Sequence, residues 1–92
     1  MKIVINKCFG CYGLSDWALK ELGIEYSNEI DRTQPDLISL VESFPEMVNG
    51  NFAELSVVNI PNETTDWEID EYDGLESVTY VVDGKIHHVY YI

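Results

Sequence analysis

Apolar positions recur at helical spacing in the first half of the chain and alternate in the last third. Residues 2–7 centre on the β-branched run Ile3-Val4-Ile5, which favours a strand, and the lack of polar alternation indicates that both faces of this strand are covered. A helix is predicted over residues 16–22, where apolar side chains repeat every three or four positions. Ser15 is a good N-cap for this helix, and Gly23 is a natural C-terminal stop.

The next segment predicts a short strand and a second helix. Residues 24–30 are expected to form the strand. Pro35 suits the first turn of a helix, and apolar residues at helical spacing continue from there to Phe44. Pro45 should break or kink this helix, because proline lacks the amide hydrogen that a helix interior needs.

From residue 52 onward the apolar positions follow the period of two that is typical of strands. Residues 55–58 are expected to form one strand, and further strands follow in the last third of the chain. Asp83-Gly84 is a strong signal for a two-residue hairpin turn, because glycine tolerates a positive φ. The turn leads into a return strand over residues 86–92 and places Tyr80 opposite His87.

Asp73-Gly74 is a second dipeptide of the kind that forms tight hairpin turns. A two-residue turn at this point would set Glu71 directly against Glu76 in the ladder. Like charges in directly opposed positions destabilise a pair of strands. We therefore expect a wider loop at Asp73-Gly74, with Glu71 and Glu76 out of register.

Together these elements predict an α+β fold: a mainly antiparallel sheet with two helices packed on one face and a C-terminal β-hairpin. A chain of 92 residues is expected to form a single domain over residues 1–92. The helical apolar stripes and the stripe of Trp67, Ile69, Val78 and Tyr80 should meet in one core. The terminal strands leave edges that self-association would cover, so a homo-oligomer is a reasonable expectation.

Composition narrows the functional classes. Apolar residues make up 46% of the chain, and no apolar run approaches the ~20 residues needed to cross a bilayer, so no membrane span is expected. Seventeen acidic residues against five Lys and Arg give a net charge of -12, which argues against direct binding of nucleic acid. The first residues are too short for a signal peptide, and two cysteines do not make a disulfide scaffold. We expect a cytoplasmic protein.

Cys8 and Cys11 form a Cys-x-x-Cys pair between a strand and a helix, which is similar to the start of a glutaredoxin. Phe-Gly is an unusual pair between such cysteines, and no Thr-Val-Pro segment supplies the cis-proline of a thioredoxin-like site. A zinc site would need His87 and His88 together, but neighbours on a strand point to opposite faces. No metal or other cofactor is expected, and a thiol oxidoreductase stays as a second alternative.

A glycine loop that runs from a strand into a helix exposes backbone amides, an arrangement that suits phosphate or carboxylate. Aromatic side chains in the loop would stack on a base, and carboxylates on the strand after residue 67 would accept hydrogen bonds from a ribose. This pattern predicts a small anionic, nucleotide-like ligand between the loop and that strand. The predicted binding residues are Phe9, Gly10, Tyr12, Gly13, Ser15, Asp70, Tyr72 and Asp73.

Acidic residues are concentrated between residues 63 and 76, which hold seven of the seventeen. No Lys or Arg occurs between Arg32 and Lys85. A solvated face is the commonest reason for such a block, and a calcium loop does not fit an alternating strand. A row of carboxylates can also imitate a phosphate backbone and occupy the nucleic-acid-binding groove of a basic protein.

Several stretches together resemble a family of small uncharacterised proteins from bacteriophages and prophage-bearing bacteria. These stretches are Met-Lys-Ile-Val-Ile-Asn-Lys-Cys at residues 1–8, Leu-Ser at residues 14–15 and Trp-Glu-Ile-Asp-Glu-Tyr-Asp-Gly at residues 67–74. The resemblance implies a phage-type accessory protein that is not an enzyme and acts inside a bacterial host cell. Such proteins often sequester a nucleotide signal of host immunity. The alternative is an acidic inhibitor that blocks a host nuclease or regulator by nucleic-acid mimicry.

Overall fold

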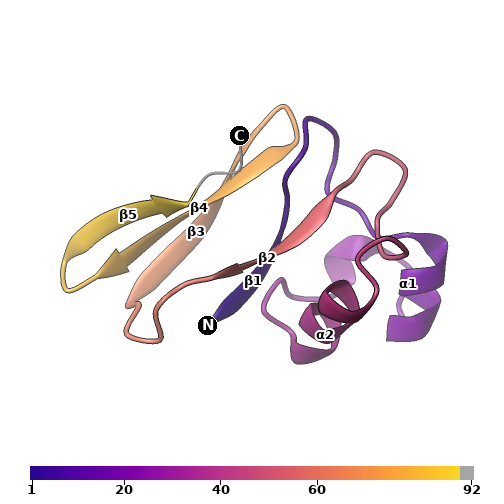
Figure 1. The fold of residues 1–92 in the computed structure, drawn as a ribbon, viewed down its shortest axis with the longest axis horizontal. Coiled ribbons are helices and arrows are strands. Elements are labelled where there is room, and N and C mark those ends of the chain that lie inside the picture. The colour runs from indigo at the N-terminus through magenta and orange to yellow at the C-terminus, as the bar shows by residue number, and fades with distance from the viewer. Residues whose placement is uncertain (90–92) are drawn as a thin grey trace.

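The computed structural model describes residues 1–89 of the chain (Figure 1). Five strands and two α-helices account for most of its regular structure. Their bounds, in chain order, are β1 (Lys2–Asn6), α1 (Asp16–Leu22), the 3₁₀ turn η1 (Ser27–Glu29), α2 (Pro35–Ser43), β2 (Leu55–Asn59), β3 (Asp66–Tyr72), β4 (Leu75–Val82) and β5 (Lys85–Val89).

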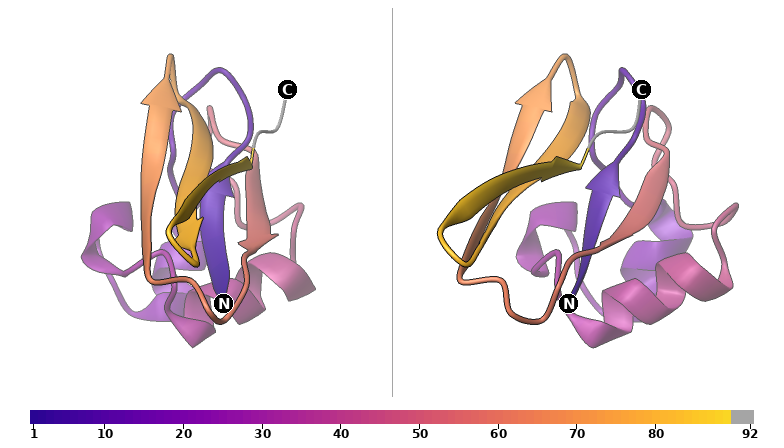
Figure 2. Two further views of the ribbon diagram at one scale, coloured as in Figure 1. Left: turned by 90° about the vertical axis from the view of Figure 1, so that its left-hand side faces the viewer. Right: turned by 60° about the vertical axis from the view of Figure 1, so that its left-hand side comes forward.

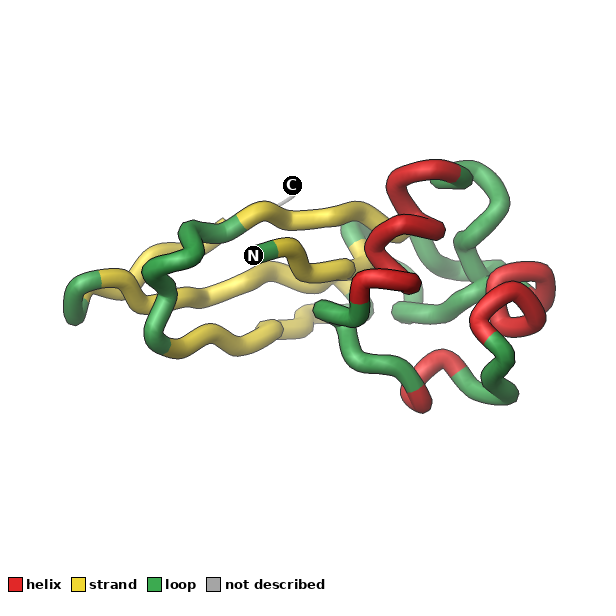
Figure 3. The backbone as a smooth tube through the Cα atoms, turned by 90° about the horizontal axis from the view of Figure 1, so that it is seen from below, coloured by secondary structure: helices red, strands yellow, loops and turns green. Residues whose placement is uncertain are grey.

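The strands form two antiparallel sheets, one of β1 and β2 and one in the order β3-β4-β5. The β1–β2 sheet lies between the three-stranded sheet on one side and the two helices on the other (Figures 1 and 2). Figure 3 shows the helices gathered at one end of the molecule, beyond the strands. The predicted α+β class and the C-terminal hairpin are confirmed, and the antiparallel strands are divided into two layers.

The division into layers produces two apolar clusters where the sequence predicted one core. Ile3 and Ile5 of β1 pack with Val78 of β4 in the cluster between the two sheets. Val4, which points to the opposite side of β1, packs in the second cluster with Leu37 and other residues of the helical layer. The expectation of one core is wrong because β1 is buried on both faces, as its sequence indicated, and therefore separates the helices from β3–β5.

Both helices begin and end where the sequence predicts. The Ser15 hydroxyl accepts a hydrogen bond from the Ala18 amide at 3.1 Å and caps α1. Gly23 ends α1 in the left-handed conformation, with φ 69°. Pro35 occupies the first turn of α2, and this helix ends two residues before Pro45.

Residues 24–30 do not form the predicted strand. They form a loop that contains η1. The Glu29 carboxylate accepts hydrogen bonds from the backbone amides of Glu25 (2.8 Å) and Tyr26 (3.2 Å), which stabilises a turn in place of an extended chain. Ile24 and Ile30 pack singly against the helical cluster, so these apolar residues anchor the two ends of a loop.

The Asp83-Gly84 turn and the pairing of Tyr80 with His87 are confirmed. The return strand β5 is described as far as Val89, and residues 90–92 of the predicted strand lie outside the described residues. The predicted wide loop at Asp73-Gly74 is wrong: both residues have positive φ (50° and 85°), and Tyr72 pairs with Leu75 across a two-residue turn.

The tight turn is tolerated because the two opposed glutamates find different partners. Glu71 stays exposed and accepts a hydrogen bond from the Gly74 amide at 2.8 Å. The Glu76 carboxylate is buried and accepts two hydrogen bonds from the Arg32 guanidinium, at 2.7 and 3.0 Å. Neutralisation by Arg32 removes the like-charge repulsion on which the prediction of a wide loop rested.

Asn6 is hydrogen-bonded to the same ion pair. We call Asn6, Arg32 and Glu76 the polar junction. The Asn6 backbone amide donates to Glu76 Oε1 at 2.7 Å, and its side-chain amide donates to the Gly74 carbonyl at 2.7 Å. Arg32 also donates to the Val4 carbonyl at 3.1 Å. The polar junction therefore links β1, the loop before α2 and the β3–β4 turn.

We expect Glu76→Gln to lower the free energy of unfolding by about 3 kcal/mol, because it leaves the Arg32 guanidinium without a counter-ion in a largely buried site. The two side chains are only 23% (Arg32) and 7% (Glu76) exposed. Urea denaturation measures the change. Glu71→Gln, at the opposed exposed position, is the matched control and should cost about 1 kcal/mol or less. Equal losses in the two variants would show that the ion pair is not structurally important.

Candidate functional site

Three loops that are far apart in the sequence meet at one end of the molecule. They are residues 8–13 after β1, residues 50–53 before β2 and the β3–β4 turn at residues 72–75, and all lie at the top of Figure 1 and of both views in Figure 2. We call them the three-loop end. Binding residues are frequently found on loops held by a rigid scaffold, so this end is the first candidate site.

The polar junction and backbone hydrogen bonds hold the three loops together. The Asn6 side chain donates to the carbonyls of Cys8 (3.1 Å) and Gly74 (2.7 Å), and so joins the first loop to the turn. The Cys11 amide donates to the Phe52 carbonyl at 3.0 Å, which joins the first loop to the second. Asn6 is fully buried, so the loops are fixed from beneath.

Glycines allow the backbones of these loops to touch. A Cβ on Gly74 would overlap the carbonyl of Gly10, and a Cβ on Gly10 would overlap the carbonyl of Phe52. Gly50 packs in the same way on Gly13, where a Cβ would lie 3.0 Å from the Gly13 carbonyl atoms. Gly10 of the predicted loop therefore serves close backbone packing, whereas a Cβ on Gly13 would meet open space.

The three-loop end presents three exposed aromatic side chains, one from each loop. Phe9 is 69% exposed, Phe52 is 74% exposed and Tyr72 is 73% exposed. Large aromatic side chains dominate the energetics of protein interfaces when they become buried. Three of them on neighbouring, hydrogen-bonded loops form a surface suited to contact with another molecule.

The predicted binding residues fall into two groups. Phe9, Gly10, Tyr72 and Asp73 come together at the three-loop end, because the contact between Gly10 and Gly74 brings the two segments side by side. The others lie apart from that contact. Asp70 points to the outside of β3, Gly13 contacts Gly50, Tyr12 lies beneath Arg32, and the Ser15 hydroxyl caps α1 and donates to the Met47 carbonyl at 2.6 Å.

Several backbone amides that an anion site would need are engaged within the chain. Gly10 donates to the Cys8 carbonyl, Cys11 to the Phe52 carbonyl and Ser15 to the Val48 carbonyl, at 2.8–3.0 Å. The Leu14 amide donates to the Ser27 hydroxyl at 2.9 Å. The backbones of Gly10 and Gly74 are in contact, so the predicted loop and the β3–β4 turn leave no gap between them at this point. Donors already paired inside the chain do not supply an anion cradle.

A cavity of about 270 Å³ lies between the first two loops of the three-loop end. It is smaller than the ~300–1,000 Å³ of most pockets for drug-sized molecules. Its lining residues are Cys11, Tyr12, Gly13, Leu14, Gly50, Asn51 and Phe52.

Tyr12 packs against Arg32 and so helps to support the loops. The Arg32 guanidinium lies over its ring, 3.4 Å from the centroid, in a cation–π contact. Its hydroxyl oxygen is buried and has no hydrogen-bond partner among the described residues. Burial raises the pKa of the Tyr12 phenol, against the opposing effect of the Arg32 charge.

A second candidate surface is the outward side of β3–β4–β5, which we call the acidic face and define by Asp66, Glu68 and Asp70. The three residues alternate along β3 with Trp67 and Ile69, which pack inward, so their carboxylates project outward and are exposed. Asp70 accepts a hydrogen bond from the Thr79 hydroxyl at 2.6 Å.

The carboxylates of the acidic face have no Lys or Arg ion-pair partner within the described residues. Ion pairs within residues 1–89 join Lys2 to Glu42, Lys7 to Glu54 and Arg32 to Glu76, and none of them involves β3. A shallow hollow of about 180 Å³ lies beside the carboxylates, lined by Asp66, Trp67, Glu68, Thr79, Val81 and Ile86. Tyr72 continues the outward row of β3, so the acidic face is continuous with the three-loop end.

Both thiols are free. The Cys8 thiol donates to the Asn6 side-chain carbonyl (3.3 Å) and to the Phe52 carbonyl (3.4 Å), so it contributes to the loop contacts. Within the described part of the chain, no three His, Cys, Asp or Glu side chains are grouped to hold a metal ion. None of the helices there has the length and apolar character to cross a membrane.

Sequence reasoning missed Phe52. The residue follows the turn-forming stretch Asn-Gly-Asn directly, at the start of the alternating apolar positions. An aromatic residue beside a turn was the available signal, since turns lie at the surface.

Comparisons of the chain with models of protein families, with curated proteins and with solved structures find no match. The resemblance to phage proteins therefore stays an expectation from the sequence.

We expect Gly74→Ala to destabilise the protein far more than Gly84→Ala. Both glycines have positive φ (85° and 74°), so each alanine should cost about 1 kcal/mol for its backbone conformation. Only at Gly74 does the new Cβ meet the Gly10 carbonyl, which should add about 2 kcal/mol. Thermal and urea unfolding of the two variants give the comparison, and equal losses would contradict a tight backbone contact.

Tyr12→Phe should raise the free energy of unfolding at neutral pH by about 1 kcal/mol, because it removes a buried hydroxyl that has no partner. The pKa of Tyr12 is higher in the folded than in the unfolded chain, so ionisation of this phenol does not affect stability below about pH 10 and lowers the free energy of unfolding as the pH rises from there through the folded pKa. The variant should lose less stability in alkali. Tyr72→Phe, at an exposed site, is the control, and identical pH profiles for the variants would refute this account.

Proposed function

We propose that the protein is a non-enzymatic interaction module that binds a basic protein surface through the acidic face and the three-loop end. The observation that carries this proposal is the outward row of Asp66, Glu68 and Asp70, which leads directly to exposed Tyr72. The partner class is a protein whose own ligand is nucleic acid, such as a nuclease or a regulator, because its binding groove is basic.

The spacing of the carboxylates supports this proposal. Alternate positions on a strand are about 7 Å apart, so the row presents three regularly spaced negative charges on a stiff support. The net charge of -12 adds a long-range field that attracts a basic partner and increases the rate of encounter. A regular row of fixed charges imitates a phosphate backbone better than the same charges on a mobile loop would.

The exposed aromatic side chains supply the binding affinity that surface charges alone do not provide. Rim charges mainly affect the rate of association, whereas buried aromatic anchors provide most of the affinity of an interface. Tyr72 continues the charge row, and Phe9 and Phe52 lie on loops that are hydrogen-bonded to one another and to the β3–β4 turn. Loops that are ordered before binding lose less entropy when the complex forms.

Capture of a nucleotide-like ligand is a second candidate, and the cavity beside Tyr12, Gly13 and Phe52 is the observation that favours it. The ligand would stack on an aromatic wall. It would have to bind against the charge of -12 and without the amides of Gly10 and Cys11. The interaction module is therefore the better supported proposal.

We expect Glu68→Lys/Asp70→Lys to reduce capture of partner proteins from a bacterial lysate by at least about tenfold, because the paired charges become repulsive. The matched control, Glu25→Lys/Glu63→Lys, changes the net charge equally at exposed sites outside the acidic face. Affinity pull-down with quantitative mass spectrometry measures the change. Duplex DNA added to the beads should release the captured protein, and raised salt should weaken the complex.

Two results would contradict mimicry: equal capture by the two double variants, or a captured protein that duplex DNA does not displace. Calorimetry with cyclic dinucleotides separates the two candidates. Binding heat that is the same for the native chain and for Glu68→Lys/Asp70→Lys would favour the nucleotide ligand.

A further inference from the structure

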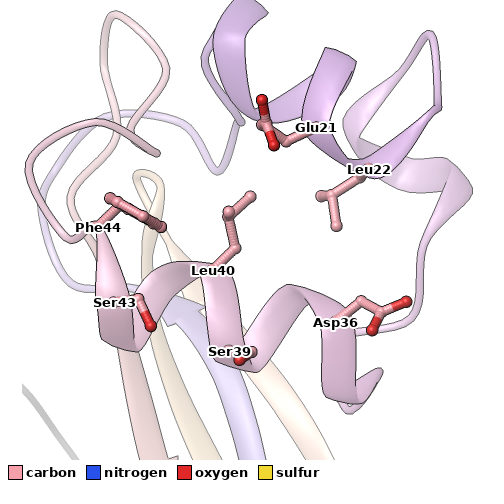
Figure 4. A pocket seen from close by; sticks show the side chains of 7 residues that line it. All are labelled: Glu21, Leu22, Asp36, Ser39, Leu40, Ser43 and Phe44. Atoms are coloured by element: carbon pink, nitrogen blue, oxygen red, sulfur yellow. The ribbon is translucent and has the colours of Figure 1, made fainter.

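A groove between α1 and α2 lies on the opposite side of the β1–β2 sheet from the acidic face (Figures 1 and 4). Its volume is about 310 Å³. Residues from both helices line it: Glu21, Leu22, Asp36, Ser39, Leu40, Ser43 and Phe44. The groove takes no part in the proposed function, since it shares no residue with the acidic face or with the three-loop end.

Leu22, Leu40 and Phe44 form an apolar floor in the groove, and the polar side chains of Ser39 and Ser43 line the groove beside it. Leu22 of α1 and Leu40 of α2 point into the space between the helices (Figure 4). Phe44, one turn after Leu40, closes one end and is exposed. Its ring packs edge-on against Trp17 with centroids 5.3 Å apart, so this wall is held in place. The apolar floor is therefore formed before any partner binds.

The rim of the groove is acidic on both helices. Glu21 comes from α1 and Asp36 from α2, both are exposed, and neither takes part in an ion pair within residues 1–89. Glu42 of α2, in contrast, is paired with Lys2 at 2.8 Å. The unpaired carboxylates thus line the groove, with apolar side chains between them.

We propose that this groove docks a basic amphipathic helix of a partner protein. Leucine-like residues of such a helix, three and four positions apart, would cover Leu22, Leu40 and Phe44. Lysine or arginine residues beside them would reach Glu21 and Asp36. The groove and such a helix are complementary in charge as well as in shape. The apolar floor would contact the apolar stripe of the helix, and the carboxylates from α1 and α2 would contact the basic residues on either side of that stripe.

A second copy of this chain does not fit the groove. Its helices carry Asp16 and Glu21 on α1 and Asp36 and Glu42 on α2, against the single basic residue Lys20. Docking of either helix into the groove of another copy would bring like charges together without compensation. The occupant is therefore a different, basic chain.

A designed helical peptide of leucine and lysine, titrated into the ¹⁵N-labelled full chain at about 0.15 M salt, tests the proposal. Shifts of amide resonances should concentrate in α1 and α2. Glu21→Lys/Asp36→Lys and, separately, Phe44→Ala should each weaken binding by at least about tenfold, whereas Glu25→Lys/Glu63→Lys should change it less than about threefold. These sites are exposed, so the variants should fold, and circular dichroism checks that they do.

Three results would overturn the proposal. One is the absence of shifts in α1 and α2, including the case in which all shifts lie on the acidic face. Another is equal binding of a leucine and glutamate peptide with the same apolar pattern. The third is movement of the α1 and α2 resonances with the concentration of the protein alone, which would identify a second copy as the occupant. None of these results would contradict the proposed role of the acidic face, which is tested with different variants.

Discussion

The arrangement of the two sheets depends on the ion pair between Arg32 and Glu76. The two residues are 44 positions apart, and the carboxylate accepts two hydrogen bonds from the guanidinium and a third from the Asn6 amide. Buried charges are costly unless they are paired, so a placement of β4 that separated them would leave both charges unpaired. Apolar contacts between Ile5 and Val78 do not impose such a condition, because hydrophobic burial is not directional. The ion pair therefore selects one placement among those that the apolar residues allow.

Features that depend on residues close together in the sequence were predicted correctly, and features that depend on distant residues were not. The cap at Ser15 and the stop at Gly23 depend on residues within one turn, and the sequence predicted both. The Asp83-Gly84 hairpin is equally local. The Asp73-Gly74 turn has the same local signal, but the prediction of a wide loop considered only the repulsion between the two opposed glutamates. Arg32, which neutralises one of them from a distant loop, has no signature in the sequence. The single predicted core failed for a similar reason, since it required knowledge of which layer lies between the others.

The residues of the candidate site were also predicted only as far as local sequence patterns allow. Phe9 and Tyr72 were both among the predicted binding residues, and the structure places their segments side by side through the contact between Gly10 and Gly74. The glycines suggested an anion cradle because a glycine loop before a helix has two physical readings, exposed amides or close backbone packing. Only the partners of the amides distinguish them. Phe52 was missed because the exposure of a side chain depends on the tertiary fold, whereas periodicity reports only on buried faces.

Burial of β1 on both faces leaves the outer side of the helical layer and of the β3–β4–β5 sheet in contact with solvent. Because each outer layer packs against the β1–β2 sheet with one side only, the other side of each layer faces solvent and is free to carry charge. A charge of -12 concentrated in this way repels itself and disfavours the folded chain. A basic partner on the acidic face would relieve that repulsion and bind the native state alone, which stabilises the fold by mass action. The negative charge that lowers the stability of the free protein would thus favour the proposed complex.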